Sequence, residues 1–230
     1  MIADLSHYAL LSRLFDPPAA GFAHEVRAVA ARLRDGYPEA AAGLERFAAL
    51  LPAEPVALAE LFVRTFDIQA ITTLDLGYTL FGEDYKRGAL LAGLSAEHRR
   101  ASNDCGTELG DHLPNVLRLL AKMPSGEVRD ELVHVIVGPA VREMCREFEP
   151  ARITKKEEIY KKHHKTIIEH ADDELRAAYC HAIGALYAVL RADFELKVSL
   201  PVEQAGGFVR SVDSEMSIES CASGTCGPSA

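Results

Sequence analysis

Residues 106–120 read GTELGDHLPNVLRLL, a polar loop followed by an apolar helix pattern. The large aliphatic residues follow the i, i+3, i+4, i+7 spacing of one helix face: Leu113, Val116, Leu117 and Leu120. Asp111 is suited to the N-cap of this helix, and Pro114 is suited to its first turn. We therefore predict an amphipathic helix that follows the loop and packs one side into a core.

The same helical spacing recurs outward from this segment in both directions, with proline or glycine between the segments. It predicts helices over residues 4–15, 19–34, 38–50, 56–66, 72–81, 84–101, 128–136 and 172–198. No segment keeps the two-residue alternation of a strand for long enough to predict a sheet. We expect an all-α fold, a single helical-bundle domain of roughly eight to ten helices over residues 1–200. Residues 201–230 are rich in glycine and serine, which predicts a flexible tail.

The composition argues against several classes of protein. The chain has 230 residues, with 25 Lys and Arg against 34 Asp and Glu, and this acidic excess argues against nucleic-acid binding. No apolar stretch reaches the roughly 18–20 residues of a membrane helix, and the start, MIADLSHYALLSRLF, lacks a secretory-signal pattern. Five cysteines, odd in number and mostly scattered, fit a reducing compartment. We therefore expect a cytoplasmic protein with no stable membrane insertion.

Catalytic signatures are missing from the sequence. It contains no nucleophile elbow, no phosphate-binding loop and no dinucleotide fingerprint. Carboxylates are plentiful, but no pair of them stands out from a solvated helical surface. We therefore predict that the protein is not an enzyme and has no cofactor of its own.

Two segments contain metal-binding residue types without forming a complete site. Residues 155–170, KKEEIYKKHHKTIIEH, hold His163, His164 and His170 among five lysines that would repel a cation, so a solvated charged helix is the preferred interpretation. Cys221 and Cys226 form a C-x4-C pair, which is half of a tetrahedral zinc site. This pair leaves three options open: a metal site shared between molecules, a redox-labile disulfide, or no specific role. We predict no metal site.

Acidic residues gather around the two loops that flank residues 84–101. They are Glu83, Asp84, Asp104, Glu108 and Asp111. Some of them have an ordinary structural explanation, because acids in the first turn of a helix complement its dipole. Their number at two loops beside apolar side chains also predicts an acidic mouth. Such a mouth would suit a peptide with basic and hydrophobic residues.

Residues 62–123 resemble the NarJ-type assembly chaperones of the TorD/DmsD superfamily in the order and spacing of short motifs. The matching pieces are Phe62-Val63, Thr65-Phe66-Asp67, Tyr78-x-x-Phe81-Gly82-Glu83, Lys86-Arg87-Gly88, Glu108-Leu109-x-Asp111-His112-Leu113-Pro114, and Leu117, Leu119 and Leu120. The resemblance implies a cytoplasmic all-helical chaperone that binds the apo catalytic (molybdopterin) subunit of a molybdenum enzyme through its N-terminal peptide, which is often twin-arginine-like. Such chaperones hold the subunit until molybdenum cofactor is inserted, and they leave before membrane attachment or export.

The resemblance also implies where the peptide binds. In the wider superfamily a Glu-Pro-x-Asp-His loop is associated with peptide binding, and here Leu109 replaces the proline of that loop. The predicted peptide-binding residues are Tyr78, Phe81, Glu83, Glu108, Asp111, His112 and Leu113. In this hypothesis the apolar side of the peptide packs on Tyr78, Phe81, Leu113 and Leu117, and its guanidinium groups meet Glu83, Glu108 or Asp111. His112 would tune the affinity near neutral pH.

Two other functions remain open at this stage. One is a small metal- or redox-active protein that uses Cys221 and Cys226. The other is an adaptor subunit that stays in a finished complex. For the chaperone, nitrate reductase is the default client that the resemblance implies, although related molybdenum enzymes would use a similar chaperone. The sequence leaves monomer and dimer equally open.

Overall fold

The all-α prediction is confirmed by the computed structural model, which describes residues 4–164 and 173–196. Within those ranges the β-type pairing is a single isolated bridge between Asp75 and His112. The predicted tail, together with Cys221, Cys226 and His170, lies outside the described residues. No helix in the described part of the chain has the length and apolar character needed to cross a membrane.

The helices follow one another with short connections. In chain order they are α1 (His7–Ser12), η1 (Arg13–Phe15), α2 (Phe22–Leu33), α3 (Pro38–Leu50), α4 (Pro55–Phe66), α5 (Leu76–Phe81), α6 (Tyr85–Arg100), α7 (Leu113–Leu120), α8 (Glu127–Glu131), η2 (Leu132–Val137), α9 (Gly138–Arg146), α10 (Pro150–His164), α11 (Asp173–Arg176) and α12 (Tyr179–Phe194). Proline occupies the first turn of α3, α4 and α7. Its fixed φ suits a helix start, and its missing N–H removes no helical hydrogen bond there.

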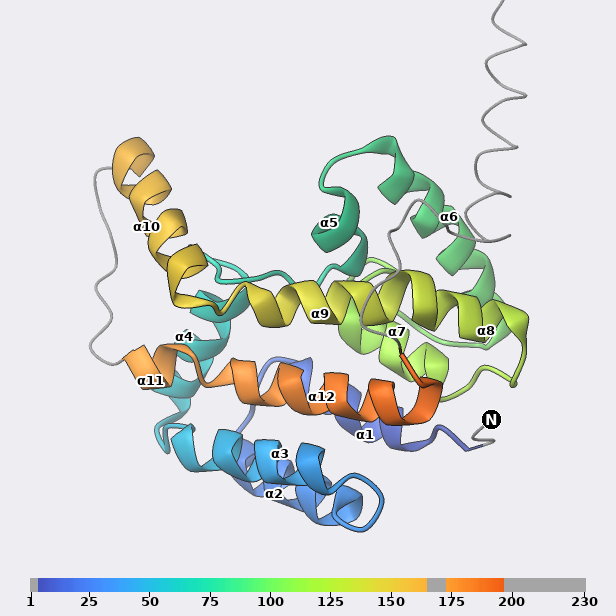
Figure 1. The fold of residues 1–230 in the computed structure, drawn as a ribbon, viewed down its shortest axis with the longest axis horizontal. Helices are drawn as coiled ribbons and strands as arrows, with labels where there is room; N and C mark the ends of the chain where they lie inside the picture. Colours follow the sequence, from blue (N-terminus) through green and yellow to red (C-terminus); the bar gives the residue numbers. More distant parts are fainter. Residues whose placement is uncertain (1–3, 165–172, 197–230) are drawn as a thin grey trace, which may run out of the picture.

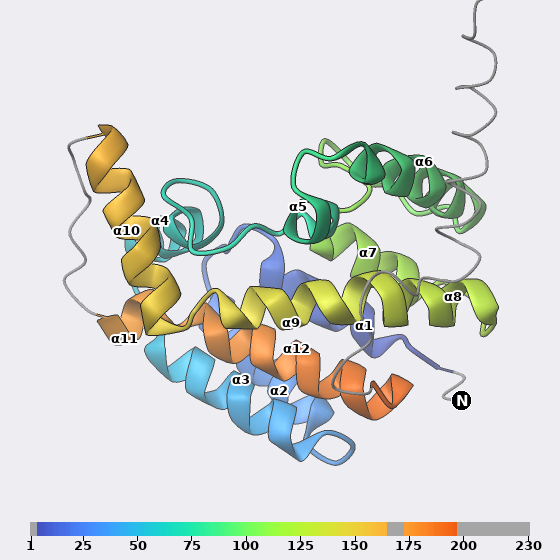
Figure 2. The ribbon, with the colours of Figure 1, turned by 45° about the horizontal axis from the view of Figure 1, so that its top comes forward.

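The core is centred on α12, which lies between α9 on one side and α2 and α3 on the other (Figures 1 and 2). Tyr179, the first residue of α12, is fully buried, and its ring lies 4.8 Å from the rings of both Phe47 and Phe66. Aromatic rings at such distances contribute roughly 0.5–1.5 kcal/mol per pair beyond the burial of their area. The predicted helix α7 packs its apolar face into the same continuous core.

The helix predicted over residues 72–81 starts late. Residues 72–75 run without helical structure, and α5 begins only at Leu76. The extended part pairs with the loop before α7, since Leu113 N–H donates to the Leu74 carbonyl at 2.8 Å and Leu76 N–H donates to the Asp111 carbonyl at 3.0 Å. Two adjacent threonines, which are β-branched, favour this extended conformation over a helix.

Two other predicted helices have different limits. The segment predicted over residues 128–136 continues through Pro139, because a π-helical stretch, η2, precedes the proline. A π-type widening accommodates a residue without an N–H inside a helical run. The segment predicted over residues 172–198 is two helices, α11 and α12, with a turn at residues 177–178 between them.

Helix α10 stands at one edge of the molecule, across the direction of α9 and α12 (Figures 1 and 2). None of the side chains described between residues 150 and 160 is buried, which agrees with the solvated charged helix predicted for this region. The side chains of His163 and His164 lie outside the described residues. Helix α5 packs against α9 as well.

Candidate functional site

A partly buried polar network joins α5, α6 and the loop before α7. Arg87 on α6 donates through Nε to Asp111 Oδ2 at 3.0 Å and through Nη2 to Asp75 Oδ2 at 2.8 Å. His112 Nδ1 lies 3.1 Å from Asp75 Oδ1, and Gly77 N–H donates to Asp111 Oδ2 at 3.2 Å. We call these residues, Asp75, Gly77, Arg87, Asp111 and His112, the clamp.

The clamp surrounds Asp111, whose side chain is fully buried with an exposed fraction of 0%. A Cβ atom on Gly77 would lie 2.7 Å from Asp111 Oδ2, so the α5 backbone approaches the carboxylate at a distance that only glycine allows. Burial disfavours the charge on Arg87, but its hydrogen bonds to Asp111 and Asp75 outweigh that effect and raise the pKa of the guanidinium. The clamp therefore holds three segments together with charge-assisted hydrogen bonds.

The carboxylate of Asp75 makes the stability of the clamp sensitive to acid. Its hydrogen bond from His112, together with Arg87, outweighs burial and holds its pKa below the ordinary value. A depressed pKa in the folded state stabilises the fold above the unfolded-state pKa, and this contribution is lost as the pH falls through the folded-state value.

We expect the free energy of unfolding of Asp75→Asn to fall less steeply than that of the unaltered protein as the pH is lowered from neutral to about pH 3. Urea unfolding at a series of pH values measures this slope. Glu83→Gln, which changes an exposed acid nearby, is the control and should follow the unaltered protein. Curves of unfolding free energy against pH that run parallel for Asp75→Asn and the unaltered protein would contradict the lowered pKa assigned to Asp75.

The structure corrects part of the predicted peptide-binding set. Leu113 and Leu117 are fully buried in the core, and Asp111 is fully buried in the clamp. These three side chains cannot contact a peptide on the surface of this conformation, because Asp111 already binds Arg87 and both leucines face the interior. The same i, i+3, i+4 spacing that predicts a helix also marks its core side.

The other predicted residues are accessible to different degrees. Glu83 and Glu108 are exposed, Tyr78 is 43% exposed, and Phe81 and His112 are partly buried. The predicted acidic mouth is weaker than expected, because Asp111 is not at the surface. Asp84 and Asp104 have local roles, since their side chains accept hydrogen bonds from the backbone N–H groups of Lys86 and Gly106.

An open groove of about 610 Å³ adjoins Tyr78 and lies between α5, α9, α10 and the segment after α4. Its apolar lining comes from Phe66, Tyr78, Ile159 and Tyr160. Tyr78 is the one predicted site residue that lines it. Ile159 is 50% exposed, so a large aliphatic side chain is available at the groove. An apolar surface with this shape is typical of a site for an amphipathic segment.

Acidic residues line the same groove. They are Asp67, which follows α4, and Glu143 and Glu147, which belong to α9 and the turn after it. Asp67 is exposed, and no ion pair engages its carboxylate within the described residues. The groove therefore combines aromatic and aliphatic surface with three carboxylates, and Lys156 lines it as well.

Sequence reasoning missed most of this groove. Phe66 and Asp67 belong to one of the motifs quoted above, and that signal was available. Ile159 and Tyr160 are embedded in the lysine-rich stretch, so the pattern indicated only a solvated helix. The contribution of Glu143 and Glu147 depends on how α9 packs beside α10, which has no local sequence signature.

Among the described residues, no group of three or more His, Cys, Asp and Glu side chains is arranged to hold a metal ion. Neither a scan against protein-family models nor a search of curated proteins gives a match for this chain. The function is therefore inferred from the groove and the clamp, together with the resemblance described above.

Proposed function

We propose that the protein is a chaperone for the apo catalytic subunit of a molybdenum enzyme, and that it binds the N-terminal peptide of this subunit. The observation that carries the proposal is the groove, in which Phe66, Tyr78 and Ile159 lie beside acidic side chains. A peptide with apolar residues and arginines matches both kinds of surface. The resemblance of residues 62–123 to NarJ-type chaperones supplies the client class.

Binding is expected to depend on both parts of the groove. The apolar side of the peptide would cover the exposed faces of Tyr78 and Ile159, which lose contact with water. A guanidinium group would reach Asp67 or another groove carboxylate, and a charge-assisted hydrogen bond of this kind contributes about 1.5–3 kcal/mol when it is partly shielded from water. Release after cofactor insertion requires this affinity to be moderate.

The clamp supports this groove indirectly. It fixes the start of α5 and therefore the position of Tyr78, whose ring also lies 5.5 Å from the Arg87 guanidinium carbon. Asp111, Leu113 and Leu117, which were predicted to contact the peptide, therefore act as positioning residues in this proposal. Glu83 and Glu108 lie away from the groove lining and are left as accessible acids near it.

Calorimetric titration tests the proposal. Synthetic peptides with the N-terminal sequences of the molybdopterin-type catalytic subunits encoded in the same genome would be titrated into the full chain. We expect one of them to bind and its scrambled version, with the same composition, not to bind. Equal heats for the native and scrambled peptides would contradict specific recognition.

Copurification distinguishes a chaperone from an adaptor subunit. A chaperone is expected to bind the apo catalytic subunit and to be absent from the mature oxidoreductase. Stoichiometric retention in the mature, cofactor-loaded complex would favour an adaptor instead.

A further inference from the structure

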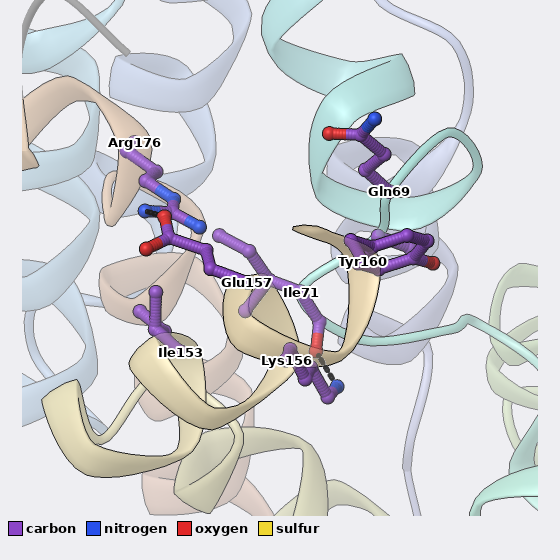
Figure 3. Close-up of a pocket in the computed structure, with 8 residues that line it drawn as sticks. Gln69, Ile71, Ile153, Lys156, Glu157, Tyr160 and Arg176 are labelled. Atoms are coloured by element: carbon purple, nitrogen blue, oxygen red, sulfur yellow. Dashed lines mark hydrogen bonds and ion pairs between the residues drawn. The ribbon is translucent and has the colours of Figure 1, made fainter. Parts of the chain in front are cut away.

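Helix α10 is attached to the rest of the molecule mainly by polar contacts. Ile153, near its start, packs partly against the core, but the described side chains that follow are partly or fully exposed. Lys156 donates to the Ile71 carbonyl, and Glu157 pairs with Arg176 of α11 (Figure 3). Contacts of this kind hold a helix in place more weakly than a buried apolar face does.

The cations of α10 also occupy carboxylates of the groove. Lys156 Nζ lies 2.7 Å from Glu147 Oε2, and Arg152 Nη1 lies 2.6 Å from Glu143 Oε1. Arg152 pairs with Glu147 as well. Hydrogen bonds from Lys156 and Arg152 outweigh burial and lower the pKa of Glu147. Two of the acids available to a basic peptide are therefore already bound by the chain itself.

We propose that α10 is a latch whose Lys156 and Arg152 compete with the basic side chains of a bound peptide for Glu147 and Glu143. This regulation rests on the proposed function of the groove. In the latched state Lys156 forms an ion pair with Glu147 and donates a hydrogen bond to the Ile71 carbonyl, and α10 forms one wall of the groove. In the bound state a cation of the peptide replaces Lys156 at Glu147, and α10 turns outward from α9 with Ile159 still packed on the peptide.

The arrangement gives the latch a direct effect on affinity. A ligand that binds one of two conformations has its apparent affinity reduced by the fraction of molecules in the other conformation. Closing the latch therefore weakens the binding of basic peptides, whereas opening it strengthens the binding. An uncharged apolar peptide gains nothing from displacing Lys156, so the latch also selects for peptides with positive charge.

Lys156→Met is the test variant, because methionine keeps much of the side-chain length and removes the charge. We expect its dissociation constant for a synthetic two-arginine N-terminal peptide to be about two- to fivefold lower than that of the unaltered protein, since it loses one partly exposed ion pair that competes with the peptide. Lys155→Met is the matched control, because Lys155 is an exposed lysine on the same helix and does not line the groove.

Hydrogen exchange of the α10 backbone provides a second measurement. We expect exchange in α10 to become faster when the peptide binds the unaltered protein, and to be faster in Lys156→Met without peptide. Arg152→Met should shift both measurements in the same direction, and it serves as a second variant if Lys156→Met does not fold.

The outcomes separate the latch from the groove. Peptide binding that is unchanged or weaker in Lys156→Met, with slower exchange in α10 on binding, would overturn the latch and leave the proposed function intact. No binding by either protein would overturn the proposed function and the competition together, whereas faster exchange in peptide-free Lys156→Met would still show that Lys156 holds α10.

Discussion

Replacing Asp111 with alanine is expected to lower the free energy of unfolding by about 3 kcal/mol, because breaking a buried ion pair leaves its remaining groups without compensation. Arg87 would keep only Asp75, and the N–H of Gly77 would lose its acceptor. Urea unfolding followed by circular dichroism measures the change. The variant should still fold at low temperature, since no clamp side chain belongs to the apolar core.

Glu108→Ala is the matched control for this experiment. Glu108 is an acidic residue three positions earlier in the same loop, but it is exposed, and its replacement should change stability by no more than about 0.5 kcal/mol. Equal stability of Asp111→Ala and Glu108→Ala would show that the clamp is not a stabilising unit. Conversely, weaker peptide binding by Asp111→Ala reports the position of α5 and not a contact between Asp111 and the peptide.

The contrast between these two acids shows what the sequence could and could not predict. The local pattern of residues 106–120 predicted α7 and the proline in its first turn correctly, because a helix depends on neighbours within one or two turns. The predicted N-cap was wrong, since His112 occupies that position and the Asp111 carboxylate binds Arg87 and Gly77 instead. Whether an acid in the preceding loop faces water depends on partners far away along the chain. Asp111 is buried by Arg87 and by the α5 backbone, which lie 24 and 34 residues from it.

The same reasoning applies to the groove. The charge density of residues 155–170 predicted a solvated helix, and none of the side chains described over residues 155–160 is buried. The sequence pattern carries no information about which acids the cations of α10 contact. The ion pairs of Arg152 and Lys156 with Glu143 and Glu147 could therefore not be predicted from it. Side-chain pairing between helices is set by packing, which here depends on the connection at residues 147–149.

The early part of α5 illustrates a third limit. Apolar residues at helical spacing favoured a helix from residue 72, and the intrinsic preference of two threonines pointed the other way. The deciding interaction is the backbone pairing with the loop before α7, which satisfies N–H and C=O groups that a helix would otherwise satisfy. This pairing places Asp75 beside His112 and so creates the clamp.

Replacing Tyr78 with alanine is expected to raise the dissociation constant for the client peptide about 30-fold, because a tyrosine at the centre of an interface commonly contributes about 2 kcal/mol. Tyr78 adjoins both the clamp and the groove, and its exposed ring is available to apolar or guanidinium groups. Ile159→Ala should raise the dissociation constant about tenfold through the loss of apolar contact alone. Calorimetric titration of the same peptide measures both changes.

Leu109→Ala is the control that makes this prediction specific to the groove. Leu109 and Ile159 are both aliphatic and are both 50% exposed, but only Ile159 lines the groove. Leu109 belongs to the loop that the family resemblance associates with peptide binding, so the pair of variants also compares the two locations. A loss of affinity in Ile159→Ala with none in Leu109→Ala supports the groove, since exposure and side-chain size are matched. The reverse pattern would move the binding site from the groove to the loop before α7.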